Sequence, residues 1–155
     1  MADPLTREQR RRVMQSNRGK DTKLELAVRR GLYARGLRYR LHGPRSIGSP
    51  DIMLKGRHAV VYVHGCFWHQ HPGCKNAPKV KHGKDPEWWA KKFRDNIARD
   101  RRNMEKAREA GYRVAVVWEC VIEQKKTTSA KRERALDRLA EWLRYNSTED
   151  FLEIG

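Results

Sequence analysis

Three cysteines and a histidine have the types and spacing of a metal site. Cys66 and Cys74 flank a short segment that contains His71, and Cys120 follows an apolar run that ends at Trp118. Three thiolates and one imidazole form a closed tetrahedral ligand set for Zn²⁺, which is typical of a structural site. Each cysteine alone is more simply explained as a small buried apolar side chain. We favour zinc because the set is complete and would order a long loop.

One aspartate and two further histidines could support hydrolysis. Asp51 begins one predicted strand and His64 ends the next, so both reach one edge of the sheet if these strands are neighbours. His69 follows in the loop, and we prefer His71 as the zinc ligand because it lies between the cysteines beside a Pro-Gly turn. A carboxylate can bind Mg²⁺, and an imidazole can take a proton from a metal-bound water. The simpler interpretation of Asp51 is a turn residue after proline.

Two more carboxylates could join this group, and each has a simpler explanation. Asp100 falls on the apolar face of a predicted long helix, where an acid needs a partner such as a histidine. It could equally lie at the edge of that face and pair with Arg101. Glu25 occupies the capping-box position after Thr22, and a hydrogen bond back to the Thr22 amide would give it a complete local role, which the sequence slightly favours.

Large aromatic side chains accompany these polar residues. Phe67 and Trp68 stand beside the histidines, and Trp88 and Trp89 begin the predicted long helix. Adjacent aromatic rings beside a polar loop are difficult to bury completely. The simpler interpretation is that Trp89 and Phe93 form part of the core, and periodicity does not choose between Trp88 and Trp89.

The elements that would position these residues alternate between helices and strands. The predicted helices run over 7–16, from a Thr22 cap to a stop at Gly36, from an Asp85 cap to Glu109 before Gly111, and from a Ser129 cap onward. The predicted strands are 38–41, 51–54, 59–63 and 112–118. This order predicts an α/β fold with a small mixed sheet between helices, as one domain over residues 1–155.

The composition points to a nucleic acid as partner. The chain has 155 residues, with 35 Lys and Arg against 19 Asp and Glu, and a formal net charge of +16. Clustered basic side chains gain affinity for phosphates by releasing counterions. No apolar run approaches the ~18 to 20 residues that a membrane span needs, and the N-terminus has no secretory pattern. We therefore expect a soluble, intracellular, strongly basic domain.

Four strings in the chain together resemble the very short patch repair (Vsr) DNA mismatch endonucleases. They are Gly-Ser-Pro-Asp at 48–51, Val-His-Gly-Cys-Phe-Trp-His at 63–69, the segment 96–102 that ends in Asp-Arg-Arg, and Val-Trp-Glu-Cys at 117–120. The His-Gly-Cys-Phe-Trp-His string is specific. The resemblance runs from Met14 to Cys120 and implies a restriction-endonuclease-like fold. It also implies nicking of one DNA strand 5′ to the thymine of a T·G mismatch, which arises when 5-methylcytosine deaminates.

The resemblance implies roles for the residues that could do chemistry. Asp51 and the main-chain oxygen of Val63 correspond to ligands of Mg²⁺. His69 corresponds to the general base, which Asp100 orients, and His64 to a contact with the scissile phosphate. Val63 stands where we associate a threonine with the family, so a hydroxyl is lost while the carbonyl oxygen remains. The acidic-x-Lys pattern of the wider nuclease superfamily is absent from 61–63.

The same resemblance implies roles for Glu25, the zinc ligands, the aromatic residues and the N-terminal arm. Glu25 corresponds to a residue of the active centre, and the zinc ligands correspond to Cys66, His71, Cys74 and Cys120. Phe67, Trp68 and Trp89 would insert as a wedge beside the mismatch. The basic arm of residues 1–20, with Met14, would embrace the DNA from the opposite groove.

The expected partner is double-stranded DNA with a T·G mismatch, bound by a monomer in a bacterial-type cytoplasm, at the nucleoid. Mismatch-repair proteins are candidate partners. A non-catalytic zinc-stabilised DNA-binding module and an RNA-binding structural protein are the rival interpretations. A histidine-metal nuclease of the ββα type is a further alternative, which the order of elements does not support.

Overall fold

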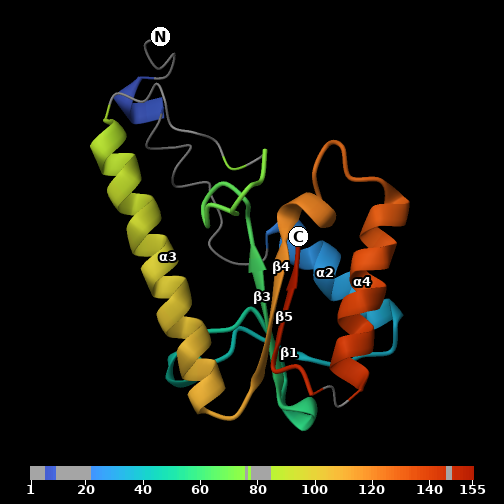
Figure 1. Ribbon diagram of the computed structural model, residues 1–155. Helices are drawn as coiled ribbons and strands as arrows, with labels where there is room; N and C mark the ends of the chain where they lie inside the picture. The colour runs from blue at the N-terminus through green and yellow to red at the C-terminus, as the bar shows by residue number, and fades with distance from the viewer. Residues whose placement is uncertain (1–5, 10–21, 76, 78–84, 146–147) are drawn as a thin grey trace.

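A central sheet with helices on both faces forms the architecture of the chain (Figure 1). The computed structural model describes residues 6–9, 22–75, 77, 85–145 and 148–155. Helices α2 (Lys23–Ala34) and α4 (Ser129–Arg144) cover one face, and the long helix α3 (Pro86–Glu109) covers the other. Within the described part of the chain, no helix is both long and apolar enough to cross a bilayer.

The sheet is mixed, as the order of elements predicts. Its strands are β1 (Arg40–Leu41), β2 (Ile52–Leu54), β3 (Ala59–His64), β4 (Arg113–Trp118) and β5 (Phe151–Ile154), hydrogen-bonded in that order. β2 runs antiparallel to both β1 and β3, whereas β3, β4 and β5 are parallel to one another. The parallel strands therefore end at the same edge, where His64 of β3 is the register partner of Trp118 of β4.

Two hydrophobic cores form because successive side chains of a strand point to opposite faces. Val61 and Val63 of β3 lie in the core beneath α2 and α4, with Leu136 and Leu139 of α4. The smaller core lies beneath α3 and contains these buried side chains: Val60, Tyr62, Cys66, Ala107, Val114, Val116 and Trp118. All of β3 is buried, as expected for a strand covered on both faces.

Helix α3 has the predicted bounds because its ends carry strong local signals. Asp85 caps its N-terminus by accepting a hydrogen bond from the Trp88 amide, and Pro86 occupies the first turn. The helix ends at Glu109, before Gly111 with a φ of +89°. The predicted cap of α4 was one residue late, because the Thr128 side chain accepts from the Lys131 amide and Ser129 is already helical.

The strands differ from the prediction at their ends and in one addition. The first strand is shorter than 38–41, β2 begins at Ile52 rather than Asp51, and β4 begins at Arg113 rather than Tyr112. Strand β5, whose residues alternate between exposed and buried positions, was not predicted from the sequence. A four-residue strand at the end of the chain carries too little pattern to be separated from a coil.

Candidate active site and metal centre

The Asp51 carboxylate lies at the sheet edge where β3 ends. Asp51 directly precedes β2, which pairs antiparallel with β3, and its Oδ2 accepts a 2.7 Å hydrogen bond from the Val63 N–H. Strands β2 and β3 are therefore neighbours, as required for Asp51 and His64 to lie at one edge of the sheet. Asp51 and His64 reach the same edge of the sheet, as expected.

Asp51 lies in an environment that disfavours its charged form. Burial, with a smaller contribution from the Glu25 carboxylate, raises the pKa of Asp51 to about 6 against the opposing effects of the Val63 N–H and His69. A cation beside Asp51 would relieve both unfavourable effects. A carboxylate next to a main-chain carbonyl supplies the oxygen ligands that Mg²⁺ prefers, with water and phosphate oxygens completing its shell. The residues present therefore fit a magnesium ion.

His69 and Asp100 form a short, largely buried polar contact. His69 Nδ1 lies 2.6 Å from Asp100 Oδ2, and both side chains are largely buried. Because an ionised carboxylate only accepts hydrogen bonds, Nδ1 carries the proton and the lone pair of Nε2 is left available. Asp100 thus faces a histidine, the first of the two alternatives left open by periodicity. The neighbouring cation is Arg99, at 3.9 Å, rather than Arg101.

His64 stacks on His69 with a ring separation of 4.0 Å and an interplanar angle of 3°. Burial, with a smaller contribution from His69, lowers the pKa of His64 to about 3, so the His64 ring is neutral at physiological pH. His64, His69 and Asp100 have ligand atoms within 4.8 Å of one another. Nitrogen lone pairs lie in the ring plane, so two parallel stacked rings do not aim them at one shared ion. This geometry favours proton transfer and phosphate contact over metal binding by the histidine pair.

A cavity of about 800 Å³ opens beside these residues. It is lined from several elements, including α2, the end of β3 and the segment after β4, by Glu25, Val63, Trp68, His69, Glu119 and Lys125 among others. The Thr22 hydroxyl accepts from the Glu25 amide, which forms the first half of the predicted capping box. The Glu25 carboxylate accepts a 3.0 Å hydrogen bond from Arg29 and is buried with it. Glu25 therefore lies at the cavity as well as at the helix start.

Asn96, which was not predicted to be a site residue, holds part of the site together. The buried side chain of Asn96 donates a 3.0 Å hydrogen bond to the Trp68 carbonyl, which ties α3 to the loop beside His69. Asn96 lies one turn before Asp100, and this spacing of four residues on one helix face is the signal that could have identified it.

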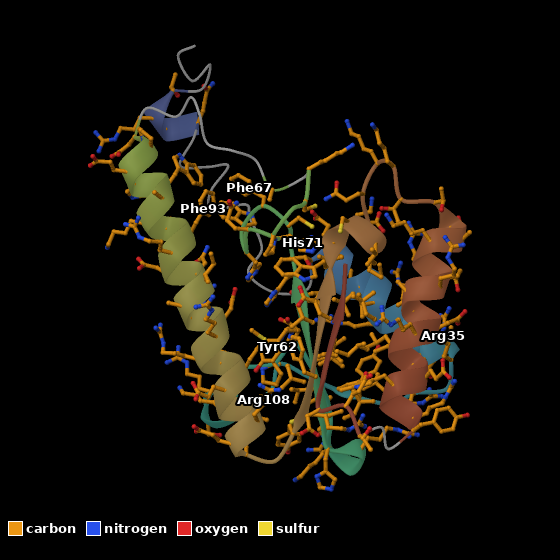
Figure 2. All side chains as sticks on the ribbon, in the orientation of Figure 1. Arg35, Tyr62, Phe67, His71, Phe93 and Arg108 are labelled. Atoms are coloured by element: carbon orange, nitrogen blue, oxygen red, sulfur yellow. The ribbon has the colours of Figure 1, made fainter. Side chains whose placement is uncertain are left out.

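Tyr62 ties the Asp51 loop to the same helix. Its hydroxyl lies 2.9 Å from the Gly48 carbonyl and 3.1 Å from the Asn103 carbonyl, and its side chain lies between the sheet and α3 (Figure 2). Gly48 has a φ of +88°, and a Cβ there would lie 1.9 Å from the Asn103 oxygen. Only glycine permits this approach, which sets the distance between the Asp51 loop and the helix that carries Asp100.

The three cysteines and one of the loop histidines converge at the same end of the sheet. The ligand atoms of Cys66, His71, Cys74 and Cys120 lie within 4.8 Å of one another. His71 Nδ1 lies 3.7 Å from the Cys66 sulfur and 3.6 Å from the Cys120 sulfur. The structure thus places His71, and not His69, with the thiols.

The chemistry of this donor set fits zinc. Burial raises the pKa of the Cys66 and Cys120 thiols, so a divalent cation is needed to hold them as thiolates. Four soft or borderline donors in a compact group match the tetrahedral shell of a structural zinc ion, with no position left for substrate.

Aromatic rings form a half-buried cluster between the loop and the start of α3. Phe67 contacts Phe93 edge to face with a ring separation of 5.4 Å, and Figure 2 shows the two labelled residues close together beside α3. Phe67 also contacts Trp68 at 4.8 Å and Trp89 at 5.7 Å. Trp88 contacts Trp89 edge to face at 4.9 Å and lies at the rim of this group, with 48% of its surface exposed. The predicted contact Met14 and most of the basic arm 1–20 lie outside the described residues.

Comparisons with known proteins agree with this arrangement. The family model described as DNA mismatch endonuclease Vsr matches residues 2–75. The type II nicking enzyme V.XorIIP of Xanthomonas oryzae pv. oryzae is 42% identical over 137 residues, which are 88% of this chain and 98% of the relative. V.NmeAIP of Neisseria meningitidis is 38% identical over 81% of this chain and 87% of its own. The DNA mismatch endonuclease Vsr of Escherichia coli K12 is 32% identical over 92% of this chain and 88% of its own.

Proposed function

Because the chain belongs to the family of the DNA mismatch endonuclease Vsr, and is therefore a DNA endonuclease with a restriction-endonuclease-like fold, we propose that it nicks one strand 5′ to the thymine of a T·G mismatch. The reaction is a Mg²⁺-dependent hydrolysis of one phosphodiester bond. It would begin the repair of mismatches left by deaminated 5-methylcytosine.

The observation that carries this proposal is the short contact between His69 and Asp100 beside Asp51. With Nδ1 held by the carboxylate at 2.6 Å, His69 presents Nε2 as the nitrogen that can accept a proton from water. The resulting imidazolium is stabilised by Asp100. His69 also lines the cavity, where a substrate phosphate can reach it.

Asp51 supplies the anionic ligand that this reaction needs. Asp51 and the Val63 main-chain oxygen would hold Mg²⁺, which when bound neutralises the phosphate and lowers the pKa of a water molecule. His69 removes a proton from the attacking water, a new bond forms between that oxygen and phosphorus, and one phosphorus–oxygen bond to a sugar breaks. The leaving sugar oxygen takes up a proton from solvent.

Two further residues assist at the same edge. The ring of His64 is held by its stack on His69, so its N–H can donate to a non-bridging oxygen of the scissile phosphate. Glu25 adds negative charge near Asp51, which supports cation binding, and its contact with Arg29 holds the carboxylate at the cavity. The proposal takes the protein to act as a monomer.

The aromatic cluster supports a preference for mismatched DNA. Phe67, Trp68 and Trp89 lie together at the loop next to the cavity and are incompletely buried. Insertion of such rings between base pairs requires unstacking, which costs a few kcal/mol and least where pairing is already defective. We assign these three side chains to the wedge beside the T·G pair.

Zinc in the four-donor cluster would serve a structural role. A complete shell of Cys66, His71, Cys74 and Cys120 leaves no open position for water or phosphate. The zinc-bound loop also carries His69 and the aromatic residues, so the ion would hold the catalytic base and the wedge in place together.

The experiment that tests the proposal is a nicking assay on end-labelled duplexes that differ at one base pair. Wild-type protein should nick the thymine strand of a T·G duplex when Mg²⁺ is present, and matched T·A and C·G duplexes should stay intact. Asp51→Ala and His69→Ala should abolish nicking while mismatch binding persists. A protein that binds the T·G duplex but never nicks it would be a binding module, and tighter binding to structured RNA would indicate an RNA-binding protein.

A further inference from the structure

One indole side chain contacts both centres at the edge of the sheet. Trp118 stacks on the ring of His71, a member of the cysteine cluster, with a separation of 4.2 Å and an interplanar angle of 9°. It also meets the ring of His64 edge to face at 5.2 Å. Because His64 stacks on His69, Trp118 joins two groups of rings that belong to different centres.

The orientation of the Trp118 side chain is set by its place in the sheet and by a hydrogen bond from its indole nitrogen. It is the last residue of β4, is 6% exposed and pairs with His64 in the parallel register. Its Nε1–H donates a 2.9 Å hydrogen bond to the Glu153 carboxylate on β5. An indole held at its backbone and at its nitrogen cannot rotate about χ1 or χ2 without breaking that bond.

The end of the described chain closes over the same pair of rings. A Cβ on Gly155 would lie 2.6 Å from Trp118 Cδ1 and 2.8 Å from His71 Cε1. The backbone of Gly155 therefore packs directly against both rings, at the end of the sheet where β3 and β4 also end (Figure 1). The strand that carries Glu153 thus covers the indole as well as binding it.

We propose that Trp118, oriented by Glu153, is a positioning residue that fixes the position of the His64–His69 stack relative to the cysteine cluster. Asp100 holds the His69 ring through Nδ1, and the edge contact of Trp118 on His64 fixes the other ring of the stack. A displacement of 1 Å at a reacting group can lower a rate by about 100-fold. Trp118 touches neither substrate nor cation and acts through His64. The effect of this residue on nicking rests on the proposed function.

The test compares three variants with one matched control. Glu153→Ala removes the acceptor of the indole N–H, Trp118→Phe removes its donor, and Glu153→Gln keeps an acceptor. The control is Trp142→Phe, because Trp142 is also 6% exposed and donates through Nε1, to the Glu149 carbonyl at 3.2 Å, but lies on α4 in the opposite layer.

We expect kcat for a T·G duplex to fall about tenfold in Glu153→Ala and Trp118→Phe, with KM unchanged. Each variant should still bind one zinc per chain by metal analysis. Glu153→Gln should restore kcat, since its amide oxygen can accept the same hydrogen bond. Trp142→Phe should lower the melting temperature and leave kcat unchanged.

A second measurement does not depend on nicking. Long-range ¹⁵N–¹H NMR spectra of the imidazole rings, recorded on zinc-loaded protein, should show shifted His64 and His69 resonances in Glu153→Ala but not in Trp142→Phe. Unchanged resonances and full kcat in Glu153→Ala would overturn the proposal, and so would a loss of kcat that only follows loss of zinc. If wild-type protein nicks no DNA, the proposed function fails, while the ring spectra still decide the role of Trp118.

Discussion

The Asp51 carboxylate accepts a 2.7 Å hydrogen bond from the Val63 N–H in a buried position where its pKa is raised to about 6. A raised pKa in the folded state means that the ionised carboxylate costs stability at neutral pH, whereas the protonated form at low pH does not. The protein without Mg²⁺ therefore loses stability through this group as the pH rises from about 4 to about 6.

Asp51→Asn should remove this cost, because an amide oxygen can accept the same hydrogen bond without a charge. In magnesium-free buffer the free energy of unfolding should rise by up to about 3 kcal/mol at pH 8, and by much less at pH 4. Urea unfolding at the two pH values measures the difference. A variant that is less stable than wild type at pH 8 would contradict the electrostatic account of Asp51.

Asp100→Asn should separate orientation of the base from binding of DNA. An amide NH₂ can donate to Nδ1 of His69 and so place the proton on Nε2, where no proton can be accepted. We expect kcat to fall by about 10² to 10⁴, with mismatch affinity unchanged. Asp95→Asn is the control, because Asp95 lies on the same helix but is exposed and faces Lys91 at 3.8 Å. Equal losses in the two variants would contradict the assignment.

Tyr62→Phe should loosen the tie between the Asp51 loop and α3. Loss of the buried hydroxyl removes the single O–H donor that the Gly48 and Asn103 carbonyls share, and we expect the free energy of unfolding to fall by about 1–3 kcal/mol. Nicking should slow by a few fold at unchanged KM, because the loop sets the position of Asp51. Tyr112→Phe, beside His58 at the opposite end of β4, should leave kcat unchanged. A normal kcat in Tyr62→Phe would show that the tie serves stability alone.

Trp89→Ala should reduce the preference for T·G over matched duplexes more than it reduces the affinity for DNA in general. Trp89 lies 5.7 Å from Phe67 and 6.0 Å from Trp68, so its removal takes away part of the wedge. Binding to a T·G duplex should weaken by about 5- to 150-fold, corresponding to base stacking of about 1–3 kcal/mol, with little change for a matched duplex. Tyr145→Ala, at an exposed aromatic residue just after α4, should behave as wild type in the same titration. Equal weakening for both duplexes would assign Trp89 to general packing.

Local signals in the sequence predicted much of the fold. Asp85, Pro86 and Gly111 mark the ends of α3, and the apolar run 59–63 marks β3, because caps and buried strands depend on neighbouring residues. The sequence could not specify the order of the strands or identify β5, since both depend on pairing between distant segments. The choice between Thr128 and Ser129 as a cap also needs backbone geometry.

Some residues of the candidate site could likewise be predicted from the sequence, and others could not. Cys66, Cys74 and Cys120 pointed to a metal centre because their residue type restricts the chemistry. Whether Asp100 faces a histidine depended on how the loop after β3 folds back onto α3, and helix periodicity carries no information about that. Asn96 and Trp118 were not recognised as positioning groups, since amides and indoles have no distinctive chemistry until their partners are known.

The central claim is that Asp51 and His69 act together in Mg²⁺-dependent nicking at a T·G mismatch. The most direct measurement is cleavage of a panel of T·G duplexes with randomised flanking bases, by wild-type protein and Asp51→Asn, with Mg²⁺ and in magnesium-free buffer. We predict a single nick 5′ to the mismatched thymine, made only by wild-type protein and only with Mg²⁺. Equal nicking by Asp51→Asn, or nicking by wild type in magnesium-free buffer, would contradict the account.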